Sequence, residues 1–260
     1  MDSYSVILKN SDEERLKIKT FLKDYYSFDD EETLVFLKKS PGFLVENKTL
    51  EKAQEIYKKT QEQNFQALII DDKDIPQLAR PISFENIEIK ESGFFYISKS
   101  IKEYIPLENV NMITTGIISE ECPEVSVTIL SSNLLEKIKT LLNIKKRKDT
   151  TSDNKPTKYK KTELIFYVDI FLNEAPLRLR IKHNDFDYSF LKKEKLYSSI
   201  ENLKILLDKV TALSLKAFKN KTTNAILKKE PLSNFIYNDL EAYEKEITWL
   251  QMIRPELSSL

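Results

Sequence analysis

The pattern of apolar and polar positions over residues 1–76 predicts a small domain of strands and helices. Short apolar runs, typical of strands, occupy residues 4–8, 43–45 and 67–70. Between these runs, apolar residues recur with the spacing of one buried helix face, and the clearest set is Ile18, Phe21, Leu22 and Tyr25. The predicted order of elements is β-α-α-β-α-β.

Capping residues and helix breakers indicate where these helices begin and end. Asp29 and Asp30 stand where the second helix should start, and acidic side chains are favourable at the positive end of a helix dipole. Pro41 and Gly42 should end this helix, and Thr49 is a suitable cap for the third. The boundaries of the domain therefore follow from local chemistry as well as from periodicity.

Three segments of this domain match a known pattern. They are Val6-Ile7-Leu8-Lys9 in the first strand, Ser40-Pro41 after the second helix, and residues 45–69 with their helix and following strand. On these residues, the stretch 4–71 resembles the C-terminal domain of the bacterial ribosomal stalk protein, whose fold is similar to that of the Clp protease adaptor. The resemblance implies a small protein-binding module of bacterial origin.

The turn before the second helix departs from that family. In the stalk domain this turn contains glycine and lysine and docks translation GTPases, whereas here residues 27–32 are acidic. Residues 1–76 hold 12 Lys/Arg against 16 Asp/Glu, a net charge of −4. This charge argues against the same partners, and we take Phe28, Asp29 and Asp30 as candidate interaction residues for a different protein.

The pattern of residues 82–218 predicts a β-rich domain that is closed by a helix. A polar connection flanked by prolines separates it from the first domain. Strand patterns occur at residues 87–89, 94–97, 110–118 and 125–129, and residues 164–172 and 177–181 predict a hairpin with arginines on one face and leucines on the other. Ser198 and Glu201 form a capping-box pattern before the helix. A barrel-like set of strands closed by a helix loosely resembles the pleckstrin-homology architecture.

Residues 219–260 predict a helical tail. Asn238 and Glu241 have the spacing of a capping box, and an apolar stripe follows on the last helix. Trp249 lies beside this stripe and is predicted to anchor a core or an interface, so we count it among the candidate interaction residues. Together the three parts predict an α+β protein.

One segment, residues 145–161, has a different composition from the rest. It holds eight Lys/Arg and two Asp, and its only large apolar side chain is Tyr159. Such a segment cannot bury enough apolar surface to order itself, so we expect a disordered loop. Its first residues, Lys145, Lys146, Arg147 and Lys148, are candidates for contacts with nucleic acid phosphates.

Composition excludes several classes of site. The only glycines are Gly42, Gly93 and Gly116, too few and too far apart for a phosphate-binding loop. With His183 as the only histidine and Cys122 as the only cysteine, the usual zinc and iron ligand sets cannot be assembled. We expect a surface or turn histidine and an ordinary free thiol, and predict no catalytic, cofactor or metal site.

The function predicted from these observations is a non-enzymatic protein-interaction or scaffold protein with an unidentified protein partner. Lys+Arg and Asp+Glu are both 41, so no overall charge attracts nucleic acid or anionic lipid. The chain shows no secretion signal and no apolar stretch long enough to span a membrane, and we expect a cytoplasmic protein. Two alternatives stay open: a nucleic-acid- or ribosome-associated factor that uses residues 145–161, and an enzyme of an unrecognised class.

Overall fold

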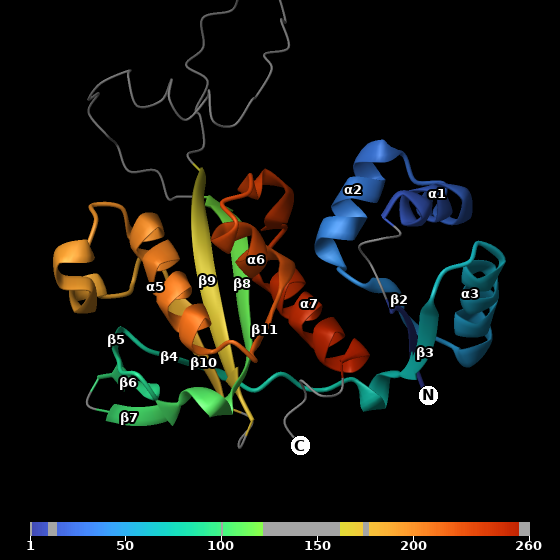
Figure 1. The fold of residues 1–260 in the computed structure, drawn as a ribbon. Helices are drawn as coiled ribbons and strands as arrows, with labels where there is room; N and C mark the ends of the chain where they lie inside the picture. The colour runs from blue at the N-terminus through green and yellow to red at the C-terminus, as the bar shows by residue number, and fades with distance from the viewer. Residues whose placement is uncertain (1, 10–14, 100, 122–161, 174–176, 255–260) are drawn as a thin grey trace, which may run out of the picture.

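The computed structural model describes residues 2–9, 15–99, 101–121, 162–173 and 177–254. The protein is of the α+β class. Its two domains lie side by side, and the last helix, α7 (Leu240–Ile253), runs between the N-terminal domain and the main sheet of the second domain (Figure 1). The predicted strand at residues 125–129, Cys122 and the basic segment 145–161 lie outside the described residues.

The N-terminal domain has the predicted order of elements. These are β1 (Tyr4–Leu8), α1 (Arg15–Tyr26), α2 (Asp30–Lys39), β2 (Phe43–Lys48), α3 (Leu50–Glu62) and β3 (Ala67–Asp71). The three strands form an antiparallel sheet in the order β2-β1-β3. The helices cover one face of this sheet, where Ile18, Phe21 and Leu22 of α1 are buried as the periodicity predicts.

Local chemistry sets the ends of these helices. Asp29 is the N-cap of α2 and accepts a hydrogen bond from the amide of Glu32, whose side chain bonds back to the amide of Asp29. Thr49 caps α3 by a single bond, which its hydroxyl oxygen accepts from the amide of Lys52. Gly42 ends the turn after α2 with φ +78°, a backbone conformation that favours glycine.

The second domain is built on a mixed main sheet. Its strands are β4 (Pro81–Ser83), β8 (Val110–Glu121), β9 (Thr162–Leu172), β10 (Arg178–Lys182), β11 (Phe218–Lys219) and β12 (Ile236–Tyr237). The central pair is β8 and β9, antiparallel along nearly their whole length, and β9 and β10 form the predicted hairpin. A separate antiparallel sheet contains β5 (Asn86–Ile89), β6 (Gly93–Ser98) and β7 (Ile101–Pro106).

Helices cover both faces of the main sheet. The long helix α5 (Ser199–Leu213) and the smaller sheet pack on one face and form the largest core, which includes Leu203, Leu206 and Leu207. On the other face, α7 packs against β8 and β9 through Tyr243 and Ile247. Shorter helical segments complete the domain: α6 (Lys221–Leu227) and the 3₁₀ turns η1 (Asp72–Asp74), η2 (Leu107–Asn109), η3 (Tyr188–Glu194) and η4 (Leu232–Phe235).

Two features of this domain differ from the prediction. Within the described residues the strands form open sheets and no closed barrel, because separate elements cover the two faces of the main sheet: α5 and the smaller sheet on one face, and α7 on the other. Residues 219–254 are not a separate tail, since β11 and β12 pair in parallel with β8 and α7 packs on the same sheet.

The N-cap of α7 also differs from the prediction. It is Asp239, whose side chain accepts a hydrogen bond from the amide of Ala242, and not Asn238. In the described part of the chain, every helix is too short or too polar to cross a membrane.

Candidate functional site

Helix α7 joins the two domains through Trp249. The side chain is only 3% exposed, and its Nε1 donates a hydrogen bond of 2.6 Å to the carbonyl of Leu8 in β1. Its ring lies directly on Gly42, where a Cβ atom would collide with it. A small apolar cluster of Ile7, Phe43 and Leu250 surrounds the contact. The structure therefore places Trp249 at an interface within the chain, where it is closed to an external partner.

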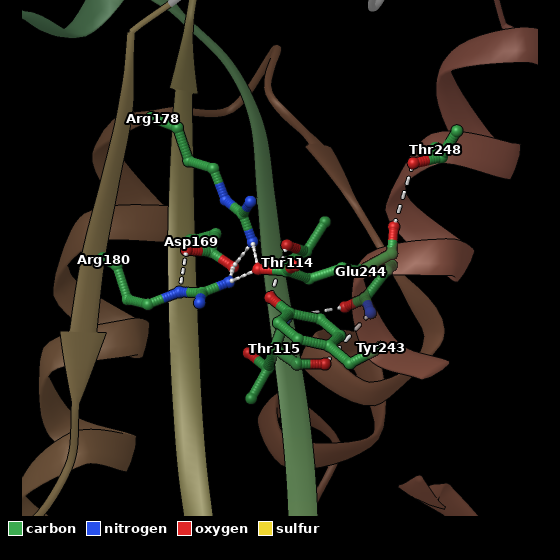
Figure 2. A network of polar contacts seen from close by, with 9 residues as sticks. Thr114, Thr115, Asp169, Arg178, Arg180, Tyr243, Glu244 and Thr248 are labelled. Atoms are coloured by element: carbon green, nitrogen blue, oxygen red, sulfur yellow. Dashed lines mark hydrogen bonds and ion pairs between the residues drawn. The ribbon is translucent and has the colours of Figure 1, made fainter. Parts of the chain in front are cut away.

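A buried ion network joins α7 to the main sheet (Figure 2). Arg178 and Arg180 of β10 both bond to Asp169 of β9, at 2.8 to 3.0 Å, and to Oε1 of Glu244 in α7, at 2.9 Å. Beside them, the hydroxyl of Tyr243 shares a hydrogen bond of 2.7 Å with Thr114. The network contains two guanidinium groups and two carboxylates, so its charges balance internally. We interpret it as a structural connection.

A second buried polar cluster lies where α7 meets α6 and β12. Oε2 of Glu246 accepts a hydrogen bond of 2.5 Å from the hydroxyl of Tyr237, and its Oε1 accepts one of 3.3 Å from Asn220. Burial raises the pKa of the Glu246 carboxyl above its ordinary value, while the bond from Tyr237 and the charge of Lys221 act in the opposite direction. Burial lowers the pKa of the Lys221 amine. These groups form one side of a cleft between the domains.

This interdomain cleft has a volume of about 330 Å³. One wall comes from α2 and residues 40–44, and the other from the start of α6, residues 234–237 and Glu246. Most of the lining is apolar, including Ile18, Phe36, Leu37, Phe43, Phe235 and Ile236. The volume falls at the lower end of the range for small-molecule sites, which often lie between domains.

The opposite face of α2 is exposed. Leu34 is 40% exposed and Val35 is 51% exposed, although apolar side chains of this size are usually buried. Glu31 and Lys38, one turn before and one turn after them, are exposed too. These four residues have the i, i+3, i+4, i+7 spacing that brings side chains onto one helix face. We call this set the α2 stripe.

The candidate residues predicted at the start of α2 lie next to the stripe. Phe28 is half-buried and stacks on Tyr26 with ring centroids 5.2 Å apart. Asp29 is occupied as the helix cap, and Asp30 forms an exposed ion pair of 2.7 Å with Lys23. The structure brings these three residues together at one end of the helix. Lys145, Lys146, Arg147 and Lys148 lie outside the described residues.

His183 is buried and not on the surface as expected, although it does lie in a turn. Its Nδ1 accepts a hydrogen bond of 3.1 Å from the amide of Phe166, and its ring packs edge-on against the Phe166 ring. Burial lowers its pKa and so favours the neutral ring that this acceptor role requires. Among the described residues, no group of three or more His, Cys, Asp or Glu side chains is placed to hold a metal ion.

The pKa of Glu246 leads to a prediction about stability and pH. Because its folded-state pKa is raised, ionisation of Glu246 opposes folding, so its penalty is absent below about pH 4.5 and develops as the pH rises through the folded pKa. We expect Glu246→Gln to gain stability relative to the native chain between pH 5 and 8, with little difference at pH 4. Urea unfolding at several pH values measures this. The exposed Glu241→Gln is the matched control on the same helix, and an equal gain in both variants would contradict the prediction.

No protein family model, curated protein or solved structure matches this chain. The resemblance of residues 4–71 to the stalk-protein domain and the looser one to the pleckstrin-homology architecture therefore stay predictions. The functional interpretation depends on the geometry of the α2 stripe and of the cleft beside it.

Proposed function

We propose that this chain is a non-enzymatic scaffold protein that associates through the α2 stripe, and that the partner on this surface is a second copy of the chain. The proposal is carried by one observation: two exposed aliphatic side chains, Leu34 and Val35, lie between an acidic and a basic residue on one helix face. Exposed apolar groups of this kind mark contact surfaces when they lie together and polar residues flank them.

The order of charges along α2 favours a second copy, in antiparallel orientation. Glu31 and Lys38 are equally distant from the midpoint between Leu34 and Val35, so a two-fold axis at that point places each Glu31 opposite the other copy's Lys38. Asp30 and Lys39 flank the stripe with the same symmetry. A self-complementary patch of this kind is what a two-fold symmetric dimer needs. In a parallel arrangement, like charges would face one another.

The non-enzymatic part of the proposal is supported by how the buried charged groups are used. Asp169 and Glu244 together neutralise Arg178 and Arg180, and His183 serves as an acceptor for a strand amide. A catalytic site needs a reactive group that faces substrate, with a partner that activates it. These buried groups instead hold the sheet and its covering helix together.

The test is sedimentation of the native chain over a range of concentrations. A ten-residue helix is about 15 Å long, so the interface is small and we expect weak association, with a Kd of roughly 10 to 100 μM. Val35→Glu should make the chain monomeric, because it places a carboxylate against the other copy's Leu34, twice, at the centre of the contact. Leu215→Glu, at a leucine that is 80% exposed elsewhere, should leave association unchanged. A native chain that stays monomeric at millimolar concentration would overturn the proposal.

A further inference from the structure

We infer that the interdomain cleft is a binding site for a small monoanion with an apolar body, a carboxylate whose hydrocarbon part fills the cavity and whose charge faces Lys221. Of the α2 stripe, Lys38 also lines the cleft, whereas the exposed Leu34 and Val35 at the centre of the stripe do not, so the cleft and the apolar centre of the stripe are separate surfaces.

The lining separates an apolar part from a polar part. Aromatic and aliphatic side chains from both domains provide most of the surface, and the largest are Phe36, Phe43 and Phe235. The polar side chains of the second domain converge, since the hydroxyl of Tyr237 lies 2.5 Å from Glu246 and 3.3 Å from Thr222. Pockets that are mainly apolar, with a few placed polar groups, are typical of small-ligand sites. The arrangement requires a ligand that is polar at one end only.

The charge of the lining favours an anion. Two lysines, Lys38 and Lys221, and a single acidic residue, Glu246, are among the residues that line the cleft. With both lysines protonated, the lining is positive whether Glu246 is ionised or neutral. Burial raises the pKa of Glu246 and lowers that of Lys221, and a carboxylate bound beside Lys221 would favour the charged amine. A neutral carboxyl group can also donate a hydrogen bond to a bound carboxylate.

The hydrogen-bond donors in the cleft lining favour a carboxylate over a phosphate. None of the residues that line the described cleft is an arginine, and the buried end offers a single amine. A phosphate carries up to two negative charges and is usually held by several donors at once, whereas one lysine supplies a single point charge. A monovalent carboxylate matches this smaller set. Free small acids and the carboxylate at the end of a peptide share this chemistry.

Isothermal titration calorimetry with the full chain tests the inference, with 4-phenylbutyrate as the probe. We expect one site per chain, and at least about tenfold weaker binding of the uncharged 4-phenylbutyramide, because the amide loses the charge-assisted contact to Lys221. Lys221→Met should weaken binding of the acid to a similar extent. Lys228→Met, at an exposed lysine at the end of the same helix, should leave binding unchanged.

A further titration with a peptide identifies whether the natural carboxylate belongs to a small acid or to a peptide end. An acetylated peptide that ends in phenylalanine with a free carboxylate should bind more tightly than the small acid only if a peptide end is the natural source. Either result for this peptide supports the carboxylate site. Equal binding of acid and amide would overturn the inference, as would the absence of binding at millimolar probe. The comparison of acid with amide needs no variant, so a Lys221→Met chain that does not fold leaves the test intact. Val35→Glu should bind the probe normally.

Discussion

Replacement of Trp249 by alanine is expected to destabilise the protein by about 3 to 5 kcal/mol, the range for removing a large aromatic side chain from a packed site. The ring fills the contact between α7 and the N-terminal domain, and Nε1 satisfies the carbonyl of Leu8. The loss should appear in urea unfolding as a lower transition midpoint. It should also make the two domains unfold in separate steps, because Trp249 is the largest side chain of the cluster between them.

Two variants separate packing from hydrogen bonding at this contact. Trp249→Phe keeps an aromatic ring over Gly42 and loses the bond to Leu8, so it should be destabilised less than Trp249→Ala. Tyr197→Ala, at a fully exposed aromatic residue, should have no effect. A Trp249→Ala chain as stable as the native one would show that the domains do not depend on this contact.

Replacement of Asp169 by alanine is expected to cost about 3 to 5 kcal/mol, as is usual when one partner of a buried ion pair is removed. The side chain of Asp169 is 0% exposed and that of Arg178 is 1% exposed, so the arginines would be left with Glu244 alone. Two guanidinium groups would then face one carboxylate, and water cannot solvate the excess positive charge because both arginine side chains are buried. Thermal and urea unfolding at neutral pH measure the loss.

The matched control removes the whole buried network. The triple variant Asp169→Leu, Arg178→Met and Arg180→Met replaces the three charges by apolar side chains of similar size and should recover most of the lost stability. Glu244, whose side chain is 34% exposed, can then reach water. If the triple variant is less stable than Asp169→Ala, the charges contribute more than mutual neutralisation and our interpretation of the network is wrong.

The N-terminal domain could be predicted from the sequence because its signals are local. Strand runs, helix periodicity and the caps at Asp29 and Thr49 all indicate the same order of elements, and the structure confirms it. The hairpin of β9 and β10 was also predictable, because the alternation of arginine with leucine fixes which residues share a face. What alternation could not show is that helix α7 covers the arginine face.

The contribution of residues 219–254 to the main sheet could not be predicted. The strands β11 and β12 have two residues each, too few for any periodicity, and they pair in parallel with the one edge of β8 that β9 does not occupy. The prediction of a barrel-like set of strands was wrong for a related reason. Alternation along single strands predicts their faces, while the layer that covers each face depends on contacts between distant parts of the chain.

The two proposed binding surfaces left partial signals in the sequence. Residues 34–37 are four consecutive apolar positions in a predicted helix. Four consecutive residues point to all sides of a helix, so some of these apolar side chains had to be exposed unless the helix was buried on every side. Glu246 lies three residues after Tyr243 on the apolar stripe of α7, so an acid on a buried face could have been noticed. The cleft itself could not, because its walls come from separate domains.

Self-association through α2 can be tested by mixing two charge variants. Glu31→Lys and Lys38→Glu should each self-associate more weakly than the native chain, because an antiparallel dimer of either one places like charges opposite one another twice. Mixed in equal amounts, they should form a heterodimer, since each lysine at 31 or 38 then faces a glutamate. The double variant should dimerise like the native chain. Glu51→Lys and Lys58→Glu provide the control, an exposed acid and base with the same spacing on α3.

Sedimentation equilibrium of the two variants, alone and mixed, is the deciding measurement. The account predicts at least about tenfold weaker association for each variant alone, recovery of native affinity in the mixture, and no effect of the α3 pair. Equal association of the native chain and both single variants, or a mixture that stays monomeric while the native chain dimerises, would contradict it.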